Sequence, residues 1–181
     1  MLISDNYSGW NGDSEREVDW QSGCCVMFRS DLLKNLKGFD EQFFYYHEDM
    51  DLCRRVWESG VSILYTPEVS IIHLGGQSTS KCFPPVGFAL DGQVTRYLYY
   101  YKHHGKSGVR SIRRIALVSL ALRRMGYGLL QLARPTESGK ARLELMRVLF
   151  DWNLRVDPVR LVEQGEEPDL GLTSAVRVLE R

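Results

Sequence analysis

The sequence has few cysteines, and their spacing gives them no obvious shared role. The four cysteines lie at positions 24, 25, 53 and 82, and none forms a Cys-x-x-Cys pair. The first twenty residues are polar and rich in turn-forming residues, so they lack the apolar core of a secretory signal peptide. We therefore expect free thiols in a reducing cytosol rather than a disulfide framework.

The sequence also lacks an uninterrupted apolar run of the roughly 18–20 residues that a membrane-spanning helix needs. We expect a cytoplasmic chain that is soluble or peripheral at the inner face of the plasma membrane. Net charge is lacking too, since 23 Lys and Arg balance 23 Asp and Glu. Yet residues 1–60 carry six basic and twelve acidic residues, whereas residues 96–147 carry twelve basic and two acidic. This segregation predicts two functional regions, the second facing an anionic partner.

The order of the predicted elements is that of an α/β region followed by a helical one. Apolar and β-branched runs predict strands in residues 18–29, 61–65 and 69–73. Capping residues and apolar spacing predict helices over residues 31–36, which Ser30 would cap, and from residue 48 or 49 to residues 59–60. From residue 91 the pattern is helical, over 91–104, to about 133 and over 140–153, with a break at Gly105–Gly108. We place the domain boundary between residues 1–90 and residues 91–181.

The run from Phe43 to Arg55 combines an aromatic cluster, adjacent carboxylates and the start of an amphipathic helix. Aromatic faces can hold sugar rings, and a carboxylate can deprotonate a sugar hydroxyl. Acids in the first turn of a helix also complement its dipole, so Glu48 and Asp49 have an equally good structural explanation. Both interpretations stay open.

A second polar group, His73-Leu74-Gly75-Gly76-Gln77-Ser78, follows the predicted strand 69–73. The short glycine-rich loop could cradle a phosphate. His73 is either a structural histidine at a strand end or a metal ligand, and a metal site would need further donors from elsewhere in the chain.

The basic region contains an apolar stripe at helical spacing, made of Ile115, Val118, Leu122, Met125, Leu129 and Leu132. Arg113, Arg123 and Arg124 lie away from the stripe. Either the helix packs on the domain with its arginines in solvent, or it lies at the interface of an anionic membrane. Nucleic-acid binding is less attractive, because the acidic first half would repel a polyanion.

Five ordered motifs resemble the family 2 glycosyltransferases, especially the rhamnosyltransferase-like bacterial enzymes of cell-surface polysaccharide synthesis. The motifs are Val18-Asp19-Trp20-Gln21-Ser22-Gly23, Phe28-Arg29-Ser30-Asp31, Gly38-Phe39-Asp40-Glu41-Gln42-Phe43-Phe44, Glu48-Asp49-Met50-Asp51-Leu52-Cys53-Arg54 with the later Pro67, and His73-Leu74-Gly75-Gly76-Gln77-Ser78. The resemblance covers residues 18–80 strongly and residues 97–104 more loosely.

The resemblance implies an inverting transfer of a sugar from a nucleotide-sugar donor to a glycan or lipid-linked acceptor. Asp49 would be the general base that deprotonates the acceptor hydroxyl. Glu48 would hold the acceptor, and Trp20, Gly23, Gly76 and Ser78 are the other expected substrate-binding residues. His73 would lie near the donor diphosphate and its Mg²⁺ or Mn²⁺ ion.

Family members also carry an N-terminal nucleotide-binding half, and the motifs matched here begin in the second half. We therefore expect the acceptor-side half of a GT-A-type, Rossmann-like domain followed by a helical region, inactive without the missing half. Two alternatives are a non-catalytic carbohydrate-binding module and a membrane-peripheral scaffold that uses only the basic helices. The sequence does not identify the sugar, nucleotide, acceptor or linkage.

Overall fold

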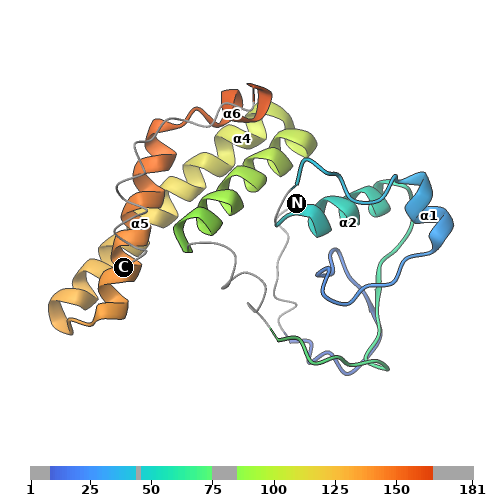
Figure 1. Ribbon diagram of the computed structural model, residues 1–181. Helices are drawn as coiled ribbons and strands as arrows, with labels where there is room; N and C mark the ends of the chain where they lie inside the picture. Colours follow the sequence, from blue (N-terminus) through green and yellow to red (C-terminus); the bar gives the residue numbers. More distant parts are fainter. Residues whose placement is uncertain (1–8, 44–45, 75–84, 165–181) are drawn as a thin grey trace. The chain divides into compact units, whose positions relative to one another are not determined.

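The computed structural model describes residues 9–43, 46–74 and 85–164 (Figure 1). The chain divides into two compact units, Met1–Gly75 and Gly76–Arg181. Within the described residues the first unit holds two short helices and a small sheet, and the second unit is helical. The domain boundary after residue 90 stays a prediction.

The first unit contains a two-stranded antiparallel sheet. It pairs β1, Arg16–Glu17, with β2, Leu64–Tyr65, so that Arg16 lies opposite Tyr65. The ladder continues one residue further, where the backbone N–H of Val18 donates to the carbonyl of Ile63 at 2.9 Å. Trp10 packs edge-on against Tyr65 with the ring centroids 4.8 Å apart. The described part of the chain has no other sheet.

The longer strands predicted for this unit are wrong. Val18 is buried, but residues 19–29 form no strand, and Met27 is 95% exposed. Residues 69–73 form no strand either, and Ile72 is 91% exposed. A β-branched run becomes a strand only where a neighbouring strand pairs with it, because the preference reflects packing on a sheet more than the backbone itself. The described residues provide no such neighbour for these two runs.

The described part of the first unit has two helices. Helix α1 spans Ser30–Asn35 and α2 spans Glu48–Glu58. The predicted bounds of α2 are confirmed, and its apolar face buries Leu52, Cys53 and Val56. The predicted cap of α1 is wrong, since Arg29 occupies the N-cap position without a side-chain hydrogen bond and Ser30 is already helical.

A buried ion pair fastens α2 to the end of α1. Asp51 is fully buried, and its Oδ2 accepts a hydrogen bond from Arg55 Nε at 2.8 Å. The two remaining nitrogens of the same guanidinium donate to backbone carbonyls just after α1, Nη1 to Leu36 at 2.7 Å and Nη2 to Gly38 at 2.8 Å. Arg55 therefore satisfies two backbone carbonyls in the turn that follows α1. It also fixes the direction in which α2 leaves the turn.

Three helices make up the described part of the second unit. They are α4, Pro85–Ala133, α5, Glu137–Arg155, and α6, Pro158–Gln164. Helix α4 is two helices joined at Gly105, whose φ of 62° and ψ of −164° lie in a region open essentially to glycine alone. The predicted break at Gly105–Gly108 is confirmed. The two segments of α4 and then α5 run back and forth beside one another (Figure 1).

The core of the second unit gathers at the α6 end. Tyr97, Val109, Trp152, Val156 and Leu161 pack together there. The hydroxyl of Tyr97 donates to Asn153 Oδ1, and burial raises the pKa of Tyr97 to about 12. Arg113 donates to the carbonyls of Asn153 and Leu154 at 3.0 and 3.1 Å, which caps the end of α5. Arg113 therefore has a structural role, in contrast to the alternative that leaves the arginines of this helix in solvent.

One described helix, over Val86–Ala133, is long and apolar enough to cross a membrane when only length and composition are considered. The sequence analysis did not anticipate this helix, because Arg123 and Arg124 interrupt its apolar run. Only 11% of the apolar window is buried within the chain.

We predict that Asp51→Ala lowers the free energy of unfolding of the first unit by about 3 kcal/mol, since it leaves Arg55 partly buried without its carboxylate. The matched control is Arg54→Ala, which removes the exposed Arg54–Glu58 pair and should cost under about 1 kcal/mol. Urea denaturation followed by tryptophan fluorescence measures both. Equal losses in the free energy of unfolding would mean that the buried Asp51–Arg55 pair stabilises the unit no more than the exposed Arg54–Glu58 pair does.

A second prediction concerns the glycines of α4. A β-carbon at Gly108 would lie 2.4 Å from His104 Cβ and 3.0 Å from the carbonyl oxygen of Tyr100. Gly108→Ala should therefore destabilise the helical unit by about 2 kcal/mol. Gly126→Ala meets nothing within 4 Å and should stabilise it by about 0.5–1 kcal/mol. Thermal denaturation followed by circular dichroism should give shifts of opposite sign, and a Gly108→Ala chain as stable as the parent would contradict the packing described here.

Candidate functional site

The first turn of α2 lies against the segment containing residues 20–23. The backbone N–H of Gly23 donates to Asp49 Oδ2 at 3.1 Å, and the thiol of Cys53 donates to the carbonyl of Gln21 at 3.7 Å. Asp49 Oδ1 accepts a further bond from the N–H of Met50 at 2.8 Å. Two backbone donors therefore fix the orientation of the Asp49 carboxylate. The structure thus brings together Gly23 and Asp49, two of the predicted site residues.

Gly23 lies near the side chain of Asp49. A β-carbon at this position would lie 3.8 Å from Asp49 Cβ, which is ordinary van der Waals contact. The glycine is therefore compatible with the contact, although the space alone does not require it.

The chain enters α2 through two strained residues. Tyr46 and His47 have φ values of 64° and 67°, in the left-handed region. Non-glycine residues of this size hold such a conformation at a cost on the order of 1 kcal/mol each, and they cluster at functional sites. His47 is the N-cap and makes no side-chain capping bond to the helix. The first turn of α2 is instead rich in acids, namely Glu48, Asp49 and Asp51, as the helix dipole favours.

Glu48 carries the most unusual group of this turn. Its Oε2 is buried, and no described residue makes a hydrogen bond to it. Burial raises the pKa of the Glu48 carboxyl, the Asp49 charge raises it further, and a bond to its own backbone opposes the shift. Buried polar atoms in folded proteins are nearly always hydrogen-bonded, so an orphan of this kind calls for an explanation.

Trp20 supplies a second orphan polar atom. Its indole Nε1 is buried and has no hydrogen-bond acceptor among the described residues. Trp20 immediately precedes the segment that Asp49 and Cys53 hold, and Glu48 immediately precedes Asp49. One donor and one acceptor without partners therefore lie on the two segments that these bonds hold together.

The remaining predicted site residues are His73, Gly76 and Ser78. His73 lies in an exposed irregular segment of the first unit. Gly76 and Ser78 lie outside the described residues. The contribution of these three residues stays a prediction.

The described residues do not fit a metal site. No group of three or more His, Cys, Asp and Glu side chains in residues 9–43, 46–74 and 85–164 lies close enough to hold an ion. Asp49-Met50-Asp51 has the spacing of an Asp-x-Asp motif, but Asp51 is fully buried in its pair with Arg55. The Mg²⁺ or Mn²⁺ ion that the resemblance implies has no donor set here.

The Asp51–Arg55 pair was not predicted from the sequence. An acid followed four positions later by a base on a helix is the spacing that brings the two side chains together. Because Arg54 makes the same kind of pair with Glu58 on the exposed side of α2, spacing alone does not reveal which pair is buried.

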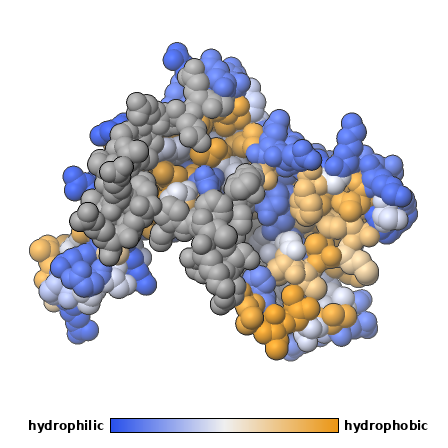
Figure 2. All heavy atoms as spheres, in the orientation of Figure 1, coloured by the Kyte–Doolittle hydropathy of each residue, from blue (hydrophilic) through white to orange (hydrophobic). Residues whose placement is uncertain are grey.

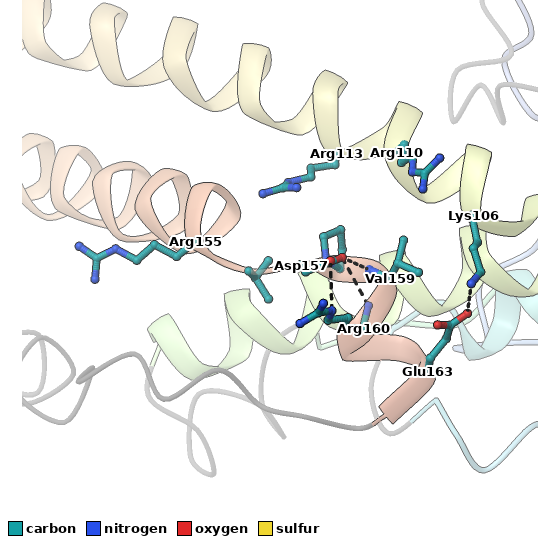
Figure 3. Close-up of a pocket in the computed structure, with 10 residues that line it drawn as sticks. Lys106, Arg110, Arg113, Arg155, Asp157, Val159, Arg160 and Glu163 are labelled. Carbon is teal, nitrogen blue, oxygen red and sulfur yellow. Dashed lines mark hydrogen bonds and ion pairs between the residues drawn. The ribbon is translucent and has the colours of Figure 1, made fainter.

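A basic pocket in the helical unit was also missed. It has a volume of about 460 Å³ and lies where the second segment of α4 meets the end of α5 and α6 (Figure 3). Its charged lining residues are Lys106, Arg110, Arg113, Arg155, Asp157, Arg160 and Glu163. Lys106 pairs with Glu163 at 2.7 Å and Arg160 with Asp157 at 3.8 Å. The pocket is therefore partly neutralised by its own carboxylates.

Comparison with known proteins places residues 11–99 in the family described as "Glycosyltransferase like family 2". An N-acetylglucosaminyl-diphospho-decaprenol L-rhamnosyltransferase of Mycobacterium tuberculosis is 32% identical over 110 residues, which cover 61% of this chain and 35% of that protein. Rhamnosyltransferase WbbL of Escherichia coli K12 is 38% identical over 70 residues, 39% of this chain and 26% of that protein. The chain thus spans about a third of the length of the mycobacterial relative and about a quarter of the length of the E. coli relative. No solved structure matches it.

The coupling between Glu48 and Asp49 can be tested directly. We predict that Asp49→Asn lowers the pKa of Glu48, because the neighbouring negative charge that raises it is removed. Asp31→Asn, which changes an exposed acid on α1, should leave the pKa of Glu48 unchanged. Carboxyl-carbon NMR titration of the three chains measures this.

The same pKa shift has a consequence for stability. A folded-state pKa raised above the unfolded value makes the stability contributed by Glu48 complete below pH 4.5, and this contribution is lost as pH rises through the folded pKa. Glu48→Gln should therefore remove part of the decline in the free energy of unfolding as pH rises from 4.5 through the folded-state pKa of Glu48. A decline of the same size in the variant would contradict the burial of this carboxyl.

Proposed function

Because residues 11–99 belong to the family 2 glycosyltransferases and are similar to rhamnosyltransferases, we propose that this chain is part of an enzyme that transfers a sugar in cell-envelope polysaccharide synthesis. The donor is a nucleotide sugar, and the acceptor is a lipid-linked saccharide. The name of the mycobacterial relative, an N-acetylglucosaminyl-diphospho-decaprenol L-rhamnosyltransferase, supports this choice of acceptor. The fold is of the GT-A type, and the first unit supplies its acceptor side.

The observation that best supports an acceptor site is the orphan oxygen of Glu48 beside an oriented Asp49 carboxylate. A carboxylate that is buried without a partner is costly in a folded chain unless a ligand completes its hydrogen bonding. An acceptor hydroxyl donating to Glu48 Oε2 would provide that bond. Trp20 Nε1 would donate to an oxygen of the same sugar.

The reaction is then a single displacement at the anomeric carbon. The acceptor oxygen forms a bond to that carbon, the bond from the carbon to the diphosphate oxygen breaks, and the nucleoside diphosphate leaves with the electron pair. Asp49 accepts the proton of the acceptor hydroxyl. The bonds from Gly23 and Met50 use part of the acceptor capacity of its carboxylate and leave lone pairs for this proton.

The roles of the two carboxylates can be separated kinetically in a full-length enzyme that carries this segment. We predict that Asp49→Asn lowers kcat by about 10²–10⁴-fold with little change in KM for the acceptor. Glu48→Gln should mainly raise the acceptor KM, because it weakens binding and leaves the base in place. Transfer of labelled rhamnose from its nucleotide donor to N-acetylglucosaminyl-diphospho-polyprenol measures both constants.

Asp31→Asn is the matched control and should leave both constants unchanged. Retained turnover in Asp49→Asn would refute the assignment of the base. A kcat loss in Glu48→Gln together with full activity in Asp49→Asn would instead make Glu48 the base. Saccharide binding with no turnover in the parent protein would favour a non-catalytic carbohydrate-binding module.

A further inference from the structure

The second segment of α4 is apolar on two opposite faces, and only one of them is covered by the described residues. Val109, Ala116 and Leu120 are buried on the side that packs on the rest of the helical unit. The other side carries the apolar stripe, which the structure leaves exposed. Its residues and exposed fractions are Ile115 56%, Val118 60%, Leu122 58%, Met125 58%, Leu129 62% and Leu132 84%.

Of the two alternatives that the sequence leaves open for this stripe, the described residues do not support packing on the domain. The spacing of its residues alternates between three and four, so they form a straight seam about 26 Å long on one side of the helix. Figure 2 shows hydrophobic residues on the surface at the end of the helical unit where α4 passes into α5. An exposed apolar seam of this length indicates a contact with another protein or with a membrane.

The charges around the stripe indicate what that contact is. From Gly92 to Thr136 the chain has nine Lys and Arg residues and no Asp or Glu. Two of them, Arg110 and Arg114, are exposed and continue the row of Val118 and Leu122 toward Gly105 at four-residue spacing. A second copy of this helix would bring cations against cations, which is unfavourable. An anionic lipid surface complements the same charges.

The packing also bears on how the helix meets the lipid. Arg124 lies over the ring of Phe150 on α5, 5.9 Å from its centroid, so this cation is directed toward the protein. Arg123 and Arg124 would sit near the middle of a spanning segment, where a charged side chain is costly. With one face packed on α5, the helix is suited to lie along a surface rather than across it.

We propose that the helical unit docks on an anionic membrane through the stripe of α4, with the helix axis parallel to the surface. The stripe enters the interface between headgroups and acyl chains, and Arg110 and Arg114 contact lipid phosphates. This docking depends on the stripe and its charges, and it does not rest on the proposed transfer reaction.

The test is co-sedimentation of the complete 181-residue chain with vesicles. One set of vesicles is phosphatidylcholine alone, and the other contains equal parts of phosphatidylcholine and phosphatidylglycerol. We expect binding to the second set that is weakened by salt, and much less binding to the first. Leu122→Asn with Leu129→Asn should reduce binding by about tenfold or more, because both leucines lose their place in the lipid.

The matched control replaces two exposed leucines outside the stripe, Leu74→Asn with Leu154→Asn, and should bind as the parent does. Circular dichroism checks that both double variants keep the parent's helix content. Equal vesicle binding by the stripe variant and the parent would overturn the proposal. So would a dimer in analytical ultracentrifugation that the stripe variant abolishes while vesicle binding persists.

An alkaline carbonate wash of the loaded vesicles distinguishes surface docking from insertion. Release of the chain into the supernatant supports a helix that lies in the interface. Retention in the vesicle pellet would mean that α4 crosses the bilayer, and this would overturn the parallel orientation.

Discussion

The first unit depends on one guanidinium group. Arg55 contacts the fully buried Asp51 within α2 and two backbone carbonyls beyond the end of α1, so a single side chain joins both helices. A buried carboxylate needs such a partner, because removing a charge from water costs several kcal/mol unless it is paired and hydrogen-bonded. Arg55 lies two turns beyond Glu48 and Asp49, so these two carboxylates take no part in the link between the helices.

The two acids of that first turn are treated differently by the structure. Asp49 is held by the N–H groups of Gly23 and Met50, whereas Glu48 has a buried oxygen with no partner. Together with the left-handed Tyr46 and His47, this gives the entry to α2 both backbone strain and a buried polar atom without a hydrogen bond among the described residues. Backbone strain and unsatisfied polar atoms are typical of binding sites, where the ligand and not the fold completes the interactions.

The sequence predicted the helices well and the strands poorly, for a physical reason. The acids in the first turn of α2, its spaced apolar residues and the glycine after it are local signals, and local hydrogen bonds make a helix. A strand depends on a distant partner, and the run around Ile72 has none among the described residues. Glu48 and Asp49 were found because they follow an aromatic run. The burial of Asp51 was not, because its sequence spacing is shared by the exposed Arg54–Glu58 pair.

The turn at Gly105 has a consequence for how copies of this chain can meet. A continuous helix over the 49 residues of α4 would be a rod of about 70 Å, and one glycine folds it back so that Tyr97 and Val109 share a core. A side chain at that position would favour the straight form. In that form each segment could reach only the complementary segment of another molecule, and reciprocal exchange of the two halves would follow. The absence of a single β-carbon thus keeps the helical unit self-contained.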